Sequence, residues 1–246
     1  GSGTIFFTHC SLRCVFCQNS PISQLGEGKE IAIEELSNMM LKLQLQGCHN
    51  INFVTPTHYM AQILEAVFLA KKKGLKIPLV YNCGGYESIE ALKLLDGIID
   101  IYMPDMKYSD DDVSKKYSSA PDYFDVSKKA VEEMHRQVGD LKLDKGIAVK
   151  GLLIRHLVLP DGLAGSDDIF DFIVKEISSQ TYVNIMAQYY TCHKASKFPE
   201  LTRRITHREY MDVLDLAKKK ALSKGFRQVL DTIDRAQIPE WTDDLK

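Results

Sequence analysis

Three cysteines lie close together in the stretch THCSLRCVFCQN, residues 8–19, where Cys10, Cys14 and Cys17 follow the spacing C-x3-C-x2-C. Cysteine thiolates bind zinc, copper(I) and iron–sulfur clusters. A structural zinc site usually takes two C-x2-C pairs, or cysteines with histidines at fixed spacing, and only one such pair is present. Three cysteines on one loop suit a [4Fe–4S] cluster, because they hold three irons and leave the fourth open to a ligand. A zinc site and three unrelated core cysteines are the alternatives.

Further polar residues stand where apolar runs are expected to end as strands, namely Thr55, Asn82, Asp105 and Lys107. Asp105 and Lys107 are two residues apart, so in a strand they share a face and can bind a ligand or each other. Arg155 stands inside the apolar run VKGLLIRHLVL, where an unpaired charge would cost several kcal/mol. Its partner is therefore expected to be a ligand carboxylate or a protein carboxylate such as Asp105.

The elements that must position these residues are short strands that alternate with helices. Most of the expected strands are continuous apolar runs, which are typical of parallel strands buried on both faces. The strands are expected at residues 4–8, 50–55, 77–82, 100–105, 149–159 and 182–188, with a last one near 227–231. Helices are expected at 32–46, 58–73, 87–96, 127–138 and 166–178, at the acidic run 110–112, and from Thr206, where Glu209 forms a capping box.

Repeated β-α units predict a parallel sheet with helices outside. Eight units would close a barrel of roughly 250 residues, so about six units predict a partial, more open (β/α)6 TIM-like barrel. A doubly wound open sheet is the alternative. Both architectures place ligands at the carboxyl ends of the strands, so we expect the polar strand ends to line one pocket. The 246 residues contain no long linker and are expected to form a single domain, residues 1–246.

Charge and composition argue against several classes of protein. The 31 Lys and Arg residues nearly cancel the 33 Asp and Glu residues, so no large basic field is available for nucleic acid. No run of about 18 apolar residues predicts a membrane span, and no signal peptide is visible. The six cysteines, three of them crowded into one loop, fit a reducing cytoplasm better than a secreted disulfide scaffold.

The cysteine loop directly follows the first expected strand, and Phe16 precedes its last cysteine. This C-x3-C-x-aromatic-C arrangement resembles the radical S-adenosylmethionine (SAM) superfamily. The resemblance extends to the pyruvate formate-lyase-activating enzymes and their uncharacterised relatives. The stretches that carry it are CSLRCVFCQN, NINFVTPTHY, DIYMPDMKY and LLIRHLVLPDG. The resemblance implies two cofactors, a [4Fe–4S] cluster and SAM. In that family the open iron binds the amino and carboxylate groups of SAM, and an electron from the cluster yields a 5′-deoxyadenosyl radical.

The resemblance also assigns roles to individual residues. It makes Cys10, Cys14 and Cys17 the cluster ligands, and Phe16 the aromatic residue near adenine. Asp105, Lys107 and Arg155 resemble residues that lie beside SAM, and Thr55 and Asn82 are further candidates for hydrogen bonds to it.

Three positions depart from the family pattern. Pro56-Thr57-His58 replaces the Gly-Gly-Glu that receives the SAM amino group, while Asn82 and Tyr189 replace an aspartate and a histidine of the activating enzymes. These departures imply that the methionine end of SAM is held somewhat differently and that the substrate can differ. Relatives usually have residues ahead of the first strand, which leaves a missing N-terminal segment as an open alternative.

The resemblance implies an enzyme whose radical abstracts hydrogen from a glycine of a partner glycyl-radical enzyme. An external one-electron donor such as flavodoxin or ferredoxin would supply the electron. A radical SAM enzyme acting on a small molecule or another peptide is the first alternative. The second alternative is a non-enzymatic iron–sulfur electron carrier, in which the Asp105–Lys107 pair and Arg155 would have no ligand to bind.

The remaining candidate residues receive weaker assignments. Cys48 and His156 are expected to pack, and Trp241 is expected to cover a surface. Cys83 and Cys192 are expected at the rim of the pocket without an assigned role, and His58 is expected to cap a helix.

Overall fold

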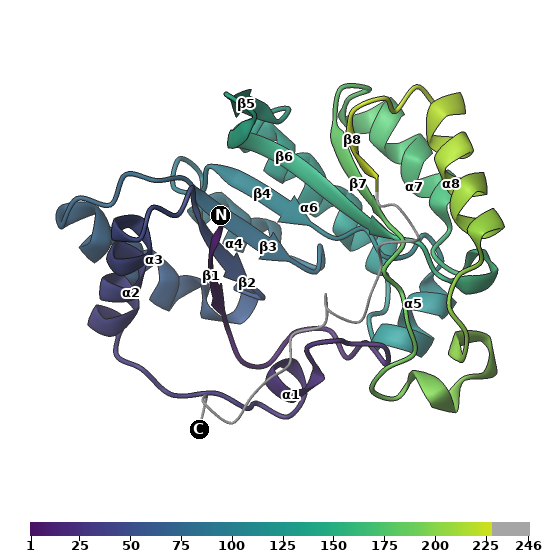
Figure 1. Cartoon of the computed structure of the whole chain (residues 1–246), viewed down its shortest axis with the longest axis horizontal. Coiled ribbons are helices and arrows are strands. Elements are labelled where there is room, and N and C mark those ends of the chain that lie inside the picture. Colours follow the sequence, from purple (N-terminus) through teal and green to yellow (C-terminus); the bar gives the residue numbers. More distant parts are fainter. Residues whose placement is uncertain (228–246) are drawn as a thin grey trace.

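The computed structural model describes residues 1–227, and its centre is a curved sheet in the order β1-β2-β3-β4-β6-β7-β8 (Figure 1). All neighbours along this path pair in parallel, while β5 pairs antiparallel with β6. The strands are β1 (Gly3–Phe6), β2 (Ile51–Val54), β3 (Leu79–Cys83), β4 (Ile101–Pro104), β5 (Lys142–Asp144), β6 (Ile147–Leu157), β7 (Tyr182–Met186) and β8 (Gly225–Arg227). This architecture confirms the expected partial barrel of parallel strands.

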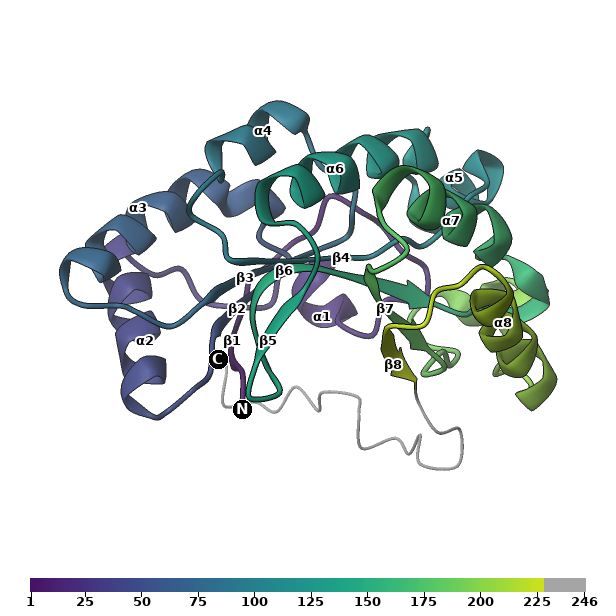
Figure 2. The same ribbon diagram turned by 90° about the horizontal axis from the view of Figure 1, so that it is seen from above.

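Helices cover one face of the sheet, and Figure 2 shows α3, α4, α6 and α7 side by side along it. Local signals explain several helix starts: the Asp110 side chain caps α5, and Thr206 with Glu209 forms the capping box of α8. The helices are α1 (Ser20–Ser23), α2 (Ile33–Leu45), α3 (Met60–Lys72), α4 (Ile89–Leu94), α5 (Asp111–Ser118), α6 (Tyr123–Val138), α7 (Ser166–Phe172) and α8 (His207–Lys219). None of those in residues 1–227 has the length and apolar character needed to cross a membrane.

Alternation along the strands gives the sheet two different faces. In β2, Ile51 and Phe53 are fully buried, whereas Asn52 and Val54 line a cavity on the other face. We call this second face the inner face. Parallel pairing places Thr4 of β1 beside Asn52 on this face, while Asn82 of β3 lies beside Val54.

The hairpin of β5 and β6 was not expected from the sequence, which predicted a strand only from residue 149. Its short first strand is fully exposed, so it lacks the apolar run that marks a buried strand. Leu141 and Ala148 pack against Val80 and Ile101. The hairpin thereby covers the apolar part of the inner face.

Several expected boundaries and assignments change in the structure. The helix expected at 127–138 begins at Tyr123, and the helix expected at 166–178 ends as a π-helical turn over Ile173–Ile177. Cys48 is half-buried rather than part of the core. Trp241 and the expected strand beyond residue 227 lie outside the described residues.

Candidate functional site

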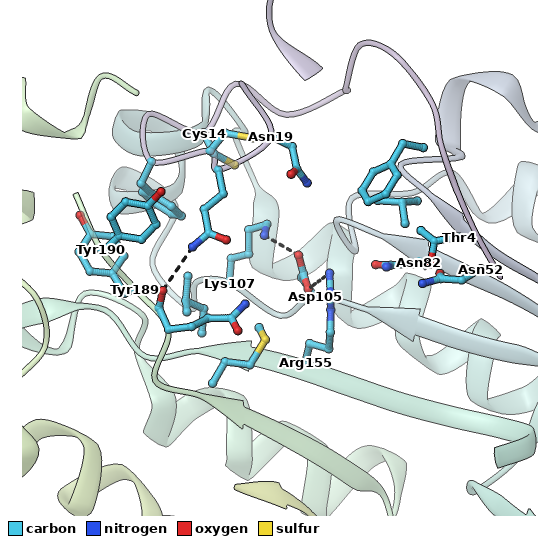
Figure 3. Close-up of a pocket in the computed structure, with 18 residues that line it drawn as sticks. Thr4, Cys14, Asn19, Asn52, Asn82, Asp105, Lys107, Arg155, Tyr189 and Tyr190 are labelled. Atoms are coloured by element: carbon cyan, nitrogen blue, oxygen red, sulfur yellow. Dashed lines mark hydrogen bonds and ion pairs between the residues drawn. The ribbon is translucent and has the colours of Figure 1, made fainter. Parts of the chain in front are cut away.

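A cavity of about 380 Å³ lies on the inner face of the sheet. Figure 3 shows its lining residues, which come from β1, β2, β3, β6 and β7, from the segments after β4 and β7, and from the cysteine loop. Seven of the nine candidate site residues meet there: Cys14, Phe16, Cys17, Asn82, Asp105, Lys107 and Arg155. The expected convergence of strand ends therefore occurs. Parallel pairing explains it, because every strand delivers its carboxyl end to the same edge.

The cysteine loop is held in place by backbone hydrogen bonds to distant segments. Arg13 and Val15 donate to carbonyl oxygens at the end of α5, at 2.8 Å each, and Lys194 donates to the Val15 carbonyl at 2.8 Å. Leu12 is 1% exposed and anchors the loop in the core. The loop is thus a rigid part of the fold, which suits a site that must keep several ligands in place.

Hydrogen-bond donors approach the sulfur atoms of the loop. The Ser118 hydroxyl donates to Cys14 Sγ at 3.0 Å, and the Leu12 amide donates to Cys10 Sγ at 3.4 Å. Cys17 Sγ lies 3.1 Å from the Ser23 hydroxyl. Such contacts stabilise thiolates. Burial nevertheless raises the pKa of Cys14 to about 11, so without a metal this thiol is protonated at neutral pH.

A zinc ion and a [4Fe–4S] cluster require different arrangements of their thiolate ligands. Within residues 1–227, no three His, Cys, Asp or Glu side chains form a ligand set for one ion. A zinc ion requires such convergence on one point, whereas a [4Fe–4S] cluster binds each thiolate at a separate iron. All six cysteines are free thiols, so none of the loop cysteines is consumed in a disulfide.

Asp105 lies between two cations. Its Oδ2 is 2.5 Å from Lys107 Nζ, and its Oδ1 is 2.6 Å from Arg155 Nη2. Burial opposes ionisation of Asp105, but the charges of Arg155 and Lys107 outweigh it and lower the pKa of this carboxyl. Asp105 and Arg155 face each other because they form a parallel bridge between neighbouring strands. Of the two partners expected for Arg155, the structure therefore contains the protein carboxylate.

The three charges leave one positive charge in excess on the cavity wall. In addition, Arg155 Nε is buried and has no hydrogen-bond partner among the described residues. Buried polar atoms in proteins are nearly always hydrogen-bonded. A ligand that carries a carboxylate would match both the excess positive charge and the unpartnered Nε donor of Arg155.

Phe16 forms an aromatic corner of the cavity. Its ring centroid lies 5.7 Å from that of Tyr189 and 6.4 Å from that of Tyr108, with edge-to-face geometry in both pairs. The Cys192 thiol donates to the Phe16 carbonyl at 3.2 Å. Cys192 therefore supports the loop from outside the cavity. The aromatic edge is suited to packing against a flat ring.

Cys10 and Thr55 are not among the residues that line the cavity. Cys10 remains on the same loop as its two partners. Thr55 follows β2 with φ +61, and the alternation of the strand places Asn52 and Val54 on the inner face instead. His58 does not line the cavity either, and its Nε2 lies 2.7 Å from the Thr8 carbonyl. His156 packs as expected, because both ring nitrogens have buried partners.

A buried carboxyl group, Glu87, was missed in the sequence. It is 5% exposed and accepts hydrogen bonds from Thr57 Oγ1 at 2.8 Å and from the Tyr81 hydroxyl at 3.1 Å. Burial raises the pKa of Glu87 to about 7. These contacts join the turn after β2 to β3, beside the site. Glu87 stands in the loop CGGYE without any apolar periodicity, so only its three-dimensional contacts reveal it.

Comparisons with known proteins found a matching family model and several related proteins. A family model described as the Radical SAM superfamily matches residues 4–151. Uncharacterized protein MJ0674 of Methanocaldococcus jannaschii is 34% identical over 228 residues, which cover 89% of this chain and 62% of that protein. The pyruvate formate-lyase-activating enzyme of Clostridium pasteurianum is 27% identical over 240 residues, which cover 92% of this chain and 90% of that enzyme. The chain thus spans less than two thirds of MJ0674.

Solved structures show the same fold at low sequence identity. SuiB of Streptococcus suis, bound to its precursor peptide SuiA, has a TM-score of 0.63 at 11% identity, covering 92% of this chain and 48% of that one. Methylornithine synthase has a TM-score of 0.55 at 14% identity, covering 99% of this chain and 76% of that one. These likenesses support the partial barrel.

Proposed function

This chain belongs to the radical SAM superfamily, whose members use a [4Fe–4S] cluster and S-adenosylmethionine, and we propose from this that it activates a glycyl-radical enzyme. The observation that carries the proposal is the near end-to-end match to a pyruvate formate-lyase-activating enzyme, over 92% of this chain and 90% of the enzyme. The family model, which matches residues 4–151, includes the cysteine loop and strands β1 to β4.

Cys10, Cys14 and Cys17 are the residues we assign to the cluster. Their shared loop and the donors to their sulfur atoms support this assignment. The bound cluster would supply the electron that cleaves SAM to a 5′-deoxyadenosyl radical. The protein holds the thiolates in place and keeps water away from the reactive site.

The walls of the cavity are assigned to SAM by their chemistry. Lys107 and Arg155 would bind its carboxylate, with Asp105 holding both cations in position, because the three together carry one positive charge in excess. Phe16 would pack against adenine, supported by Tyr189. Asn82 is 6% exposed on the cavity wall and would donate or accept a hydrogen bond. Thr55 keeps only an indirect role, since Asn52 and Val54 occupy the wall beside it.

The substrate in this proposal is a glycine in a partner protein, and a flavodoxin or ferredoxin is the electron donor. The radical derived from bound SAM would take a hydrogen atom from the glycine α-carbon, which would leave a glycyl radical on the partner and 5′-deoxyadenosine in the cavity. We place the protein in the cytoplasm, where its six thiols stay reduced. We also propose that residues 1–246 act as one domain, supported by the continuous sheet of residues 1–227.

The experiment is anaerobic reconstitution with iron and sulfide, followed by reduction in the presence of SAM and a candidate glycyl-radical enzyme. The reconstituted protein should be brown, with about four irons per chain. Its reduced EPR signal should change when SAM is added, and the partner should then acquire an organic radical signal. A colourless protein that retains one zinc would overturn the cofactor assignment. A cluster that cleaves SAM but never yields a radical on the partner would overturn the substrate assignment.

One observation favours a second candidate function, in which a different peptide or a small molecule is modified. The turn after β2 carries Pro56-Thr57-His58, and Thr57 is engaged by Glu87 instead of facing the cavity. The residues near the methionine end of SAM thus differ from the activating-enzyme pattern. In that case SAM cleavage would persist while glycyl-radical formation is absent.

A further inference from the structure

We propose that Thr4 and Asn52 form a subsite for an uncharged amide of the substrate, so that the group presented to the radical is peptide backbone. The inference rests on the proposed function and deepens it, because it says which residues select the substrate. We call these two residues, one on β1 and one on β2, the amide subsite.

Thr4 and Asn52 lie side by side on the inner face. They are register partners in the parallel pair of β1 and β2, and both line the cavity. Figure 3 shows them grouped with Asn82 at one end of the cavity, while Tyr189 and Tyr190 occupy the other end. The ion pairs of Asp105 lie between the two ends. The amide subsite is thus separated from the aromatic corner assigned to adenine.

Asn52 carries an unsatisfied atom at this position. Its Oδ1 is buried and has no hydrogen-bond partner among residues 1–227. An apolar residue would cost less at a position without a partner, and Val54, two residues later on the same face, is apolar. A carboxamide offers both an acceptor and donors, which is the complement of a peptide group. The neighbouring Thr4 hydroxyl can donate or accept as well.

Charge on the cavity wall argues for an uncharged substrate group. Apart from the cysteines assigned to the cluster, Asp105, Lys107 and Arg155 carry the only formal charges among the lining residues, and these three are paired with one another away from Thr4 and Asn52 (Figure 3). A charged substrate group beside Thr4 and Asn52 would lose its hydration without gaining a counter-charge. A peptide backbone segment loses less hydration free energy, because the Asn52 carboxamide replaces its hydrogen bonds to water.

The test uses the full-length reconstituted enzyme and a capped peptide, acetyl-alanyl-glycyl-alanine amide, with both glycine α-hydrogens replaced by deuterium. In the transfer, the glycine C–D bond breaks, a C–D bond forms at the 5′-carbon, and the external donor supplies the electron. The wild type should place deuterium in 5′-deoxyadenosine. Asn52→Leu should reduce this deuterium at least tenfold, while peptide-independent SAM cleavage stays within twofold. Asn38→Leu, at an exposed position on α2, is the matched control and should transfer deuterium normally.

The outcomes separate the two proposals. If Asn52→Leu transfers deuterium as well as the wild type, the amide subsite is wrong and the proposed function stands. The wild type could instead cleave SAM without transferring deuterium to 5′-deoxyadenosine from either the peptide or a deuterated intact glycyl-radical enzyme. That result would contradict the proposed function itself, independently of the amide subsite. Asn52→Leu should melt no lower than the wild type, because a buried unpaired oxygen is removed. If this variant does not fold, Thr4→Val replaces it in the experiment. The same loss of deuterium transfer is expected, and the same conclusion follows from its presence or absence.

Discussion

Cys14 is the most enclosed of the three loop cysteines, at 8% exposed, and the Ser118 hydroxyl donates to its sulfur. Cys14→Ala should therefore remove a cluster ligand and leave a reconstituted protein that has lost most of its iron. Cys83→Ala is the matched control, because Cys83 is also buried, at 3% exposed, but belongs to β3 and not to the cysteine loop. It should retain about four irons per chain, as should Cys192→Ala. Iron analysis and the visible spectrum provide the measurement. Loss of iron from either control would mean that the ligands are misassigned.

Arg155 tests whether the paired charges bind a ligand. Arg155→Met keeps a chain of similar length, and Asp105 retains Lys107 as a partner, so the fold and cluster should survive. The affinity for SAM should fall about tenfold or more, as expected for losing roughly 1.5–3 kcal/mol from a charge-assisted hydrogen bond. Titration calorimetry under anaerobic conditions measures this loss directly.

The control for this change is Arg208→Met, which removes an arginine that is 91% exposed and pairs with Asp212 on α8. It should leave SAM binding unchanged. An Arg155→Met protein that melts well below the wild type yet binds SAM normally would show that Arg155 serves the fold alone.

The loop from β3 to α4 lies directly on the segment that carries Asp105. Gly85 makes this approach possible, because an added Cβ would lie 2.2 Å from the Asp105 carbonyl oxygen. Gly97 has almost the same backbone angle, φ +76 against +77, but nothing within 4 Å. Both alanine substitutions incur the strain of a positive φ, about 1 kcal/mol. Gly85→Ala should cost roughly 1–3 kcal/mol more and should weaken SAM binding. Equal unfolding midpoints in urea for the two variants would contradict this account.

Glu87 connects the turn after β2 to β3 and should make stability depend on pH. Burial raises the pKa of this carboxyl from 4.5 to about 7, so the folded chain binds a proton that the unfolded chain has released across that interval. Stability contributed by Glu87 is therefore present at low pH and is lost as the pH rises from 4.5 to 7, by roughly 3 kcal/mol in total.

Glu87→Gln removes this titration and retains a hydrogen-bonding side chain for Thr57 and Tyr81. Unfolding free energies of both proteins should be measured from pH 5 to pH 8. The difference between wild type and variant isolates Glu87, because all other titrating groups are shared. The wild type should lose stability relative to the variant as the pH rises. Parallel curves would show that Glu87 is ionised throughout.

The cysteine loop links distant parts of the chain, since it bonds to the end of α5 and to Lys194 after β7. A cluster held by this loop should therefore stabilise the whole molecule, because binding to the folded state alone raises its stability. Removal of iron with a chelator under anaerobic conditions should lower the melting temperature by several degrees, and reconstitution should restore it. Cys14→Ala should not respond to the chelator. An unchanged melting temperature in the wild type would show that the loop folds independently of its ligand.

Many features of this molecule can be predicted from the sequence, because the residue patterns that indicate them are local. Continuous apolar runs predicted the parallel strands, and the spacing of Cys10, Cys14 and Cys17 predicted a cluster loop after the first strand. The convergence of Asn82, Asp105 and Lys107 followed from topology alone, since parallel strands end at one edge. The short strand β5 escaped detection because an exposed strand of three residues has no apolar pattern.

Other features depend on contacts between residues far apart in the chain, which no local pattern contains. Arg155 pairs with Asp105 across fifty positions because their strands are neighbours in register. Asn52 lines the cavity and Thr55 does not. The two residues are three positions apart, and side chains an odd number of positions apart along a strand point to opposite faces. Glu87 becomes a buried acid only when Thr57 and Tyr81 close around it. Local periodicity thus specifies which elements form, whereas register and packing specify which side chains meet.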